Sequence, residues 1–215
     1  ATEAVQAISA SQLIVQVVKQ SPQPVTIFVS GPHTNLAEAL RMEPTIAGHI
    51  RLVQIMGGAV YVPGNIHSDW PLLANTVAEW NIWVDPIAAS EVFSAGLPLR
   101  IAPLDVTNQV LAIGADAVAW EASGSPEGLL AAELLRKLLD SCPAGVYIWD
   151  VVAAVGATDP GLCWADRLYL DVVTAPGDQQ GRTMPSTSQA ANATVCLIPD
   201  ADLIRARMAE ILGRR

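Results

Sequence analysis

Apolar residues along this chain alternate between strand-like runs and helix-like spacings. A helix is predicted to begin near residue 9 or 11 and to end near residue 19. Residues 25–29 are β-branched and aromatic, as in a buried strand, and residues 35–42 follow with helical spacing. A second strand is predicted at residues 52–56, before a long loop that reaches about residue 81. The first half of the chain therefore predicts strand, loop and helix units.

The second half continues the alternation. Asp85 is predicted to cap a helix with Pro86 at its first position, and Gly96 stands where that helix should end. Further helices are predicted over residues 125–139, 150–158 and the C-terminus with basic residues in its last turn, and strands over residues 99–103, 168–173 and 194–198. This order predicts an α/β fold of the Rossmann-like kind, with an open, mainly parallel sheet and helices on both faces. We expect one domain over residues 1–215, because no linker or repeat divides the chain.

Composition narrows the function classes. Hydrophobic residues make up 51% of the chain and charged residues 15%, so disorder is excluded. The net charge of −9 argues against nucleic acid as a partner, because that binding needs clustered Lys and Arg. The longest apolar run, residues 146–157, is too short to span a membrane and contains Asp150. The N-terminus lacks the basic region of a signal peptide, and we expect a cytoplasmic protein.

The cysteines bear on the same question. Cys142, Cys163 and Cys196 are odd in number, widely spaced and not part of a C-x-x-C pair. This pattern predicts buried free thiols in a reducing compartment, without a disulfide scaffold or a zinc site.

Two loops hold the candidate chemistry. In an open α/β sheet, ligands bind beyond the carboxyl ends of the strands, which here precede residues 30–35 and 57–81. Glycines in both loops allow the backbone to approach a ligand closely. Asn65, Glu79 and Asn81 supply donors and acceptors of the kind that bind hydroxyl groups. The combination indicates a sugar ligand.

Four motifs in these regions carry a family resemblance. They are G-P-x-T-N at residues 31–35, M-G-G-A with G-N at residues 56–65, A-E-x-N with D-P at residues 78–86, and L-D-V-T at residues 104–107. In this order they resemble the inosine-uridine preferring nucleoside hydrolases, over about residues 24–200. Four ordered motifs at spacings that fit the strands and helices are far more specific than any one of them. The resemblance implies calcium-dependent hydrolysis of the N-glycosidic bond of purine or pyrimidine ribonucleosides.

The resemblance also implies roles for particular residues. The Ser30 carbonyl would bind calcium, and Asp150 would bind both calcium and the ribose 3′-hydroxyl. Asn65 and Glu79 would hold the 5′-hydroxyl and Asn81 the 2′-hydroxyl, while Met56 would line the sugar pocket. In the family the metal carries the attacking water, an aspartate takes its proton, and the transition state is oxocarbenium-like.

Two departures from the family pattern qualify these roles. The opening D-T-D-P-G-x-D-D motif, which supplies the general base and most calcium ligands, is absent from the sequence. The catalytic base is therefore expected outside this chain, which predicts either a companion N-terminal polypeptide or a processed or truncated product, and an inactive isolated chain. Trp149 stands where many relatives have a histidine; an indole can stack on a base but cannot protonate it.

Each residue also has a structural interpretation. Asp150 could cap the following helix, Glu79 could be a solvated loop carboxylate, Asn65 a turn residue and Met56 a core residue. His67 and Trp70 could form a lid or simply lie on the surface, and the leucines of residues 129–139 could be core or the interface of a homo-oligomer. Trp80, Trp83 and Trp164 are expected to be packing residues. Two rival functions remain, a non-catalytic nucleoside or ribose binder and a structural or regulatory subunit.

Overall fold

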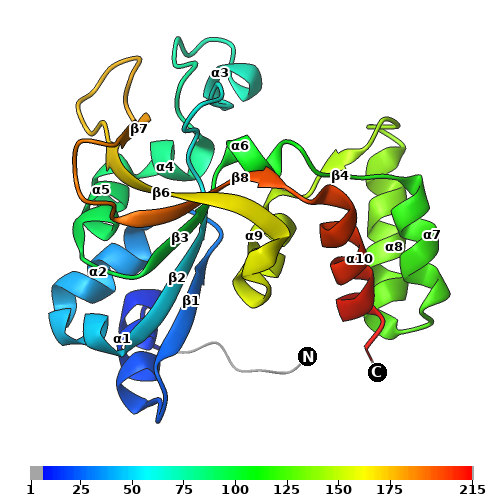
Figure 1. The fold of residues 1–215 in the computed structure, drawn as a ribbon, viewed down its shortest axis with the longest axis horizontal. Coiled ribbons are helices and arrows are strands. Elements are labelled where there is room, and N and C mark those ends of the chain that lie inside the picture. Colours follow the sequence, from blue (N-terminus) through cyan, green and yellow to red (C-terminus); the bar gives the residue numbers. More distant parts are fainter. Residues whose placement is uncertain (1–6, 215) are drawn as a thin grey trace.

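The computed structural model describes residues 7–214, and Figure 1 labels its elements. The helices are α1 (Ala10–Gln20), α2 (Thr34–Met42), α3 (Ile66–Asp69), α4 (Trp80–Val84), α5 (Pro86–Ser94), α6 (Leu104–Thr107), α7 (Gly114–Ala122), α8 (Pro126–Leu139), α9 (Trp149–Thr158) and α10 (Ala201–Leu212), with 3-10 turns η1 (Pro44–His49) and η2 (Pro160–Leu162). The strands are β1 (Val25–Val29), β2 (Ile50–Met56), β3 (Leu99–Ala102), β4 (Leu111–Ala112), β5 (Val146–Tyr147), β6 (Cys163–Val172), β7 (Thr183–Ser186) and β8 (Ala193–Pro199).

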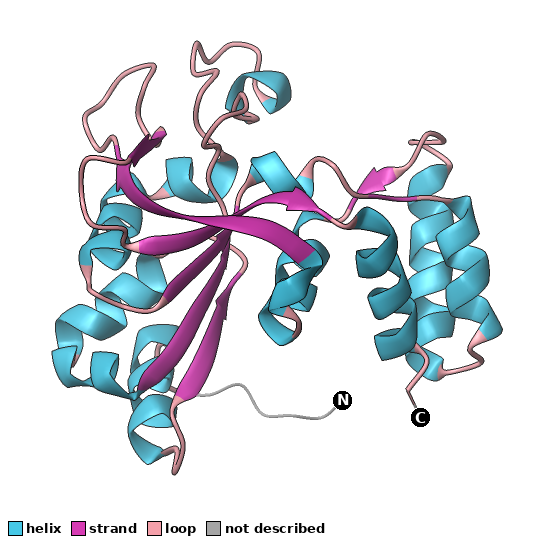
Figure 2. Cartoon of the chain, in the orientation of Figure 1, coloured by secondary structure: helices cyan, strands magenta, loops and turns pink. Residues whose placement is uncertain are grey.

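A six-stranded sheet forms the centre of the molecule, in the order β1-β2-β3-β8-β6-β7. The first four strands of this order pair in parallel, whereas β6 runs antiparallel to both β8 and β7. Helices α1, α2 and α5 lie on one side of the sheet and α9 on the other (Figures 1 and 2). The predicted fold, a mainly parallel sheet with helices on both faces, is confirmed.

An apolar core between the sheet and the helices α2 and α5 holds the strands in place. Val53, Ile55, Ile101 and Val195 on the central strands are fully buried, and they pack with apolar residues of α2 and α5. Burying one such side chain contributes about 1.5–3 kcal/mol. The β-branched runs seen in the sequence thus form the rigid platform from which the loops at the carboxyl ends of the strands project.

Helix boundaries follow the predicted capping signals in the first half of the chain. Ser9 and Gln12 form a capping box at the start of α1. Asp85 caps α5, where its Oδ1 accepts a hydrogen bond of 3.0 Å from the Ala88 amide, and Gly96 follows the helix with a φ of +70°. At the C-terminus, by contrast, the last turn of α10 holds no basic residue, contrary to expectation.

Helices α7, α8 and α10 pack around a separate apolar cluster beside the sheet. Ala132 and Leu135 of α8 are buried in this cluster. The outer face of α8 is different: its leucines at 129, 130, 134 and 138 are 47–58% exposed. The core interpretation of these four leucines was therefore wrong. Within the part of the chain that is described, no helix is both long and apolar enough to cross a membrane.

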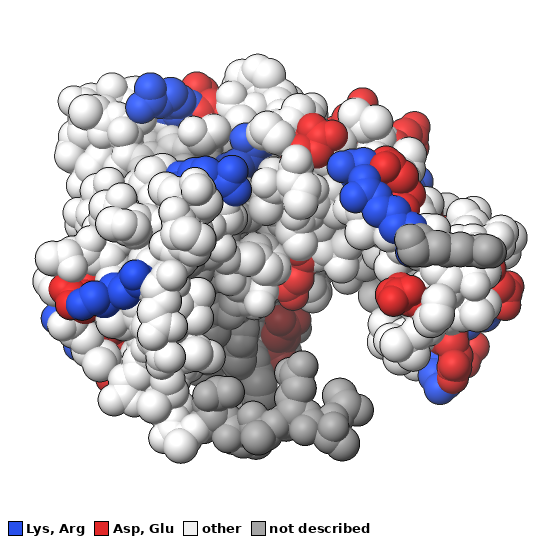
Figure 3. Space-filling model, turned by 90° about the horizontal axis from the view of Figure 1, so that it is seen from below, with Lys and Arg blue, Asp and Glu red and all other residues white. Residues whose placement is uncertain are grey.

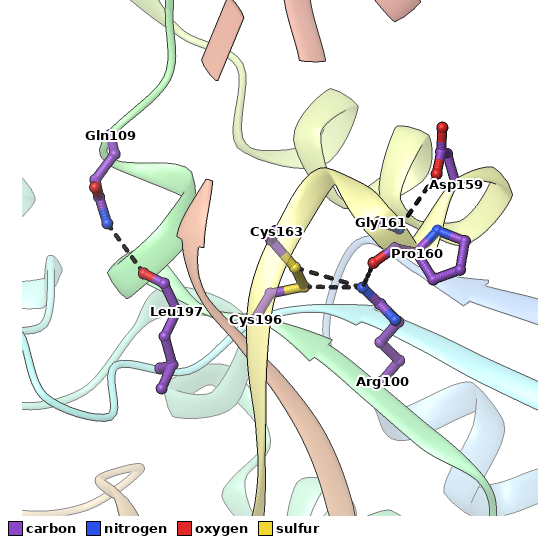
Figure 4. Close-up of a disulfide and its surroundings, with 8 residues drawn as sticks. All are labelled: Arg100, Gln109, Asp159, Pro160, Gly161, Cys163, Cys196 and Leu197. Atoms are coloured by element: carbon purple, nitrogen blue, oxygen red, sulfur yellow. Dashed lines mark hydrogen bonds between the residues drawn. A yellow bond between two sulfur atoms is a disulfide. The ribbon is translucent and has the colours of Figure 1, made fainter. Parts of the chain in front are cut away.

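The cysteine prediction is also corrected by the structure. Cys163 and Cys196 form a disulfide with a Cα–Cα distance of 5.8 Å, and the unpaired Cys142 is exposed (Figure 4). The two bonded residues are 33 positions apart in the sequence, but β6 and β8 are antiparallel neighbours that bring them together. A register shift between Trp164 and Ala165 adjusts their alignment. Sequence spacing carries no information on such cross-strand pairing.

Candidate active site

A cavity of about 450 Å³ lies beyond the carboxyl ends of β1 and β2, at the start of α9. It brings together every residue to which the sequence assigned substrate or metal binding. The lining residues are Ser30, Met56, Asn65, Asp69, Trp70, Glu79, Trp80, Asn81, Trp149 and Asp150. They come from five separate segments of the chain, so the fold is what assembles the cavity.

Glu79 is the most enclosed carboxylate of this cavity. It is 2% exposed and caps α4: Oε1 accepts from the Asn81 amide at 2.9 Å, and Oε2 accepts from the amides of Gly58 at 3.0 Å and Ile82 at 3.2 Å. Burial raises the pKa of Glu79, and these three amide donors oppose that rise. A Cβ at Gly57 would lie 3.3 Å from the Glu79 Oε2, so the glycine at this position leaves space for the carboxylate. The interpretation of Glu79 as a solvated loop residue was wrong.

Asn81 follows on the buried side of α4 and is 8% exposed. Its Nδ2 donates to the Met56 carbonyl oxygen at 3.1 Å and lies 3.4 Å from the Met56 Sδ. These contacts fix the side-chain amide at the end of β2. Met56 is 3% exposed and packs in a small apolar cluster with Ala59 and Ala102, so it serves both the core and the cavity wall.

Asn65 is held by its backbone and by its side chain. Its amide donates to the Ala78 carbonyl at 3.1 Å, and its Oδ1 accepts from the Trp80 amide at 2.9 Å. Gly64, immediately before it, lies so close to the 76–78 segment that a Cβ there would be 1.9 Å from the Ala78 carbonyl oxygen. The glycine of the G-N motif therefore allows the two ends of the long loop to meet and sets the position of Asn65.

Asp150 and Ser30, the two residues expected to bind calcium, both line the cavity. Ser30 directly follows β1 and is exposed. Asp150 is the second residue of α9, whose N-cap is Ile148, so the interpretation of Asp150 as the capping residue was wrong. Partial burial raises the pKa of Asp150. A carboxylate that loses hydration in this way is stabilised in its charged form by a nearby cation.

Trp149 is oriented by two contacts. Its indole Nε1 donates to Asn108 Oδ1 at 2.8 Å, and its ring stacks on Tyr147 with centroids 5.3 Å apart. The indole can therefore offer a flat apolar face to a ligand while its only donor is already bonded. Asn108, at the end of α6, was not among the predicted site residues.

The long loop adds an aromatic wall that the sequence did not predict in full. Trp70 and Trp80 stack with centroids 6.0 Å apart and line the cavity together with Asp69. Trp80 is 36% exposed and Trp164 is 58% exposed, so both differ from the expected packing role. His67 lies outside the cavity lining and its Nδ1 is 2.7 Å from the Leu73 carbonyl, a contact within the loop. The unusual length of the loop was the available signal for Trp70.

Asp105 of the L-D-V-T motif does not line the cavity but holds the loop that does. It is 5% exposed, and its carboxylate accepts from the amides of Val60 at 2.8 Å and Tyr61 at 2.7 Å. These bonds anchor the start of the loop that carries Asn65. The motif thus has a structural function in this chain.

The described donors do not by themselves complete a calcium site. Calcium takes roughly 6–8 oxygen ligands. Within residues 7–214, no group of three or more His, Cys, Asp or Glu side chains is arranged to hold a metal ion. Of the carboxylates in the cavity, Glu79 is already occupied by three backbone amides. Asp150, the exposed Asp69 and the Ser30 carbonyl remain, which is too few for a calcium ion.

Similarity to known proteins extends over almost the whole chain. The family model described as inosine-uridine preferring nucleoside hydrolase matches residues 1–206. This chain belongs to that family. The resemblance that the four motifs predicted is confirmed.

Curated relatives and solved structures agree with this assignment. The pyrimidine-specific ribonucleoside hydrolase RihA of Enterobacter sp. (strain 638) is 41% identical and is matched over 95% of this chain and 67% of its own length. The RihA of Citrobacter koseri is 33% identical, over 98% of this chain and 66% of its own length. The chain therefore spans about two thirds of the length of these relatives.

Among solved structures, the purine-preferring ribonucleoside hydrolase from Gardnerella vaginalis superimposes with a TM-score of 0.84 at 25% identity, over 99% of this chain and 68% of that one. The inosine-uridine preferring nucleoside hydrolase from Bacillus anthracis gives 0.83 at 26% identity, over 99% and 67%. The names of these relatives differ in the preferred base, and each is a nucleoside or ribonucleoside hydrolase.

Proposed function

We propose that this nucleoside hydrolase family member binds a ribonucleoside in the 450 Å³ cavity and takes part in hydrolysis of its N-glycosidic bond. The observation that carries the proposal is the convergence of Asn65, Glu79, Asn81 and Asp150 on one cavity. These residues come from three separate segments of the chain and offer the carboxylate and amide groups that bind sugar hydroxyls. Relatives named ribonucleoside hydrolases support the same reaction.

The ribose is assigned to the polar side of the cavity. Asn81 holds the 2′-hydroxyl, because its Nδ2 is bonded to Met56 while the amide oxygen is left to accept. Glu79 and Asn65 hold the 5′-hydroxyl, and Asp150 holds the 3′-hydroxyl. Backbone bonds position both Glu79 and Asn65 before any ligand arrives, so little side-chain entropy is lost on binding.

The base is assigned to the aromatic side. The indole of Trp149 can stack on a purine or a pyrimidine, since either has a flat π-face. Its Nε1 is already bonded to Asn108, and an indole has no acidic proton near neutral pH. This chain therefore contributes stacking rather than protonation to departure of the base.

Calcium binding requires more oxygen ligands than residues 7–214 supply. Asp150 and the Ser30 carbonyl are the share that this chain supplies, and we propose that carboxylates of a companion N-terminal segment supply the rest. Strand β1 pairs with β2 on one side only, so its other edge offers a place for such a segment among the described elements. Phe28 on this strand is 40% exposed.

The same shortage of metal ligands favours one rival, a non-catalytic ribonucleoside binder. Such a binder would retain its ligand when calcium is chelated, whereas a hydrolase that shares Asp150 between metal and ribose would bind more weakly. The two are separated by an assay of product formation.

The test is ribose release from inosine and uridine with calcium, measured for this chain alone and together with a polypeptide that carries the acidic motif. We expect release only from the pair, and Asp150→Asn should reduce it about 100-fold because a shared metal and ribose ligand is lost. The matched control is Asp140→Asn, an exposed residue at the end of α8, which should leave the rate unchanged. Release by the isolated chain would contradict the ligand argument, and an inactive pair would refute the hydrolase proposal in favour of the binder.

A further inference from the structure

A row of polar side chains crosses the sheet on the face covered by α9. Arg100 of β3 and Arg167 of β6 are both register partners of Thr194 on β8, which lies between them. Directly paired residues project from the same face of a sheet. Two interstrand spacings place the Cα atoms of the arginines about 10 Å apart. Two cations and a hydroxyl therefore share one face over three adjacent strands.

This row lines a cavity of about 740 Å³. The cavity lies at the amino ends of β3 and β8, beside the last turn of α9, whereas the candidate active site lies at the first turn of that helix. Its remaining walls are mainly apolar and include Leu97, Gly156 and Ala157. We call it the arginine groove.

The arginines of the groove are not neutralised by a carboxylate of the described residues. Most described Lys and Arg side chains form an ion pair with a carboxylate. Within residues 7–214, Arg100 and Arg167 form none, although the chain has a net charge of −9. Figure 3, a view from below, accordingly shows basic side chains with acidic neighbours at the periphery and others surrounded by uncharged residues.

Arg100 is held in place with donors to spare. One of its Nη atoms donates to the Pro160 carbonyl at 2.6 Å and lies 3.4 Å from the sulfur atoms of Cys163 and Cys196 (Figure 4). Its Nε is buried without a hydrogen-bond partner among the described residues. Burial lowers the pKa of Arg100, and Asp159 opposes this only from a distance. The other Nη forms no hydrogen bond with the described residues, so its two N–H donors remain for a ligand.

We propose that the arginine groove is a binding site for a phosphate group, held between Arg100 and Arg167 with the Thr194 hydroxyl below it. A tetrahedral oxyanion presents oxygens in several directions and can meet two separate guanidinium groups and a hydroxyl at once. A planar carboxylate would need only one of the two guanidinium groups, because a single guanidinium already offers it two parallel N–H donors. The groove is also large enough for a phosphate that is attached to a larger molecule.

The test is a calorimetric titration of the full chain with inorganic phosphate in calcium-free buffer at constant ionic strength, with chloride as the reference anion. A second titration with glycerol 3-phosphate, which carries neither the ribose nor the base that the candidate active site would bind, distinguishes a free phosphate from a phosphate ester: tighter binding of the ester would identify a phosphate attached to a larger molecule, and equal binding would identify the free anion. The variants are Arg167→Gln, whose exposed side chain is replaceable without loss of the fold, and Thr194→Val. Arg51→Gln is the matched control, because Arg51 also lacks a carboxylate partner among the described residues but lies outside the groove.

We expect saturable one-to-one binding that weakens about tenfold in Arg167→Gln, the effect of losing a charge-assisted hydrogen bond. Thr194→Val should weaken binding by a smaller factor, and Arg51→Gln should bind as the unchanged chain does. Equal loss in Arg51→Gln and Arg167→Gln would reduce the effect to net charge and overturn the proposal. Absence of binding by both ligands to the folded chain would overturn it as well.

Discussion

His33 shows how strongly one buried residue can couple stability to pH. It is fully buried against Phe93, and both ring nitrogens lack a partner within the described chain. Burial lowers the pKa of His33 from 6.5 to about 4. The folded state therefore binds the proton less well than the unfolded state, so the stability that the neutral ring gives is complete above pH 6.5 and is lost as pH falls towards 4.

Replacing His33 by Leu should remove this pH dependence. We expect the free energy of unfolding of the unchanged chain to fall by roughly 3 kcal/mol more than that of the variant between about pH 7 and about pH 4. Urea denaturation at a series of pH values measures the difference. The exposed His49→Leu variant is the control and should retain the steep decline. Parallel curves for His33→Leu and the unchanged chain would contradict this account.

Residue chemistry made part of the candidate site predictable. Asn65, Glu79 and Asn81 stood out because amide and carboxylate groups follow glycines near the expected ends of strands. The bonds from three backbone amides to Glu79 could not be predicted, because they depend on how α4 meets the loop at Gly58. Trp70 reaches the cavity only because the loop folds back, which residue type alone does not indicate.

At the scale of an element, the loop between β2 and α4 depends on one glycine. A Cβ at Gly64 would lie 1.9 Å from the Ala78 carbonyl oxygen, so Gly64→Ala must push the two ends of the loop apart. We expect a loss of roughly 1–3 kcal/mol in unfolding free energy, together with weaker nucleoside binding as Asn65 moves. Gly31→Ala is the matched control in another motif, since nothing lies within 4 Å of its Cβ. A lower melting temperature for Gly31→Ala than for Gly64→Ala would contradict the close approach of residue 64 to the Ala78 carbonyl oxygen.

The disulfide joins β6 to β8 and should stabilise the antiparallel half of the sheet. Replacing Cys163 and Cys196 by Ser should lower the unfolding free energy by about 2–4 kcal/mol, whereas the exposed Cys142→Ser should have little effect. Thiol alkylation of the air-oxidised, denatured chain, read by mass spectrometry, gives a direct count. Labelling of Cys142 alone is expected before reduction, and labelling of all three cysteines before reduction would exclude the bond.

Elements with strong periodicity were predictable and those without it were not. Strands β1, β2, β3 and β8 were expected because each contains a run of β-branched or other apolar residues. Helix α7 was missed because its small residues give a weak apolar pattern, and β4, β5 and β7 are too short to show alternation. The pairing of Cys163 with Cys196 depends on a register shift between strands that no single strand encodes.

At the scale of the whole molecule, the two cavities lie at opposite ends of the parallel strands and have opposite character. The candidate active site contains the carboxylates of Asp69, Glu79 and Asp150, whereas the arginine groove contains Arg100 and Arg167. Helix α9 borders both, with Asp150 in its first turn and Gly156 in its last. Opposite charge at the two sites means that a nucleoside and a phosphate group would be bound at separate places.

The claim on which the account rests is that the cavity around Asn81 binds the ribonucleoside. Its most direct test is a calorimetric titration of the chain with inosine and with uridine, in parallel for Asn81→Ala and for Gln23→Ala, an exposed control at the other end of β1. The account predicts one-to-one binding that weakens at least about tenfold in Asn81→Ala, because the 2′-hydroxyl loses its buried partner, and that is unchanged in Gln23→Ala. Nucleoside binding by a folded Asn81→Ala variant with the affinity of the unchanged chain would contradict it.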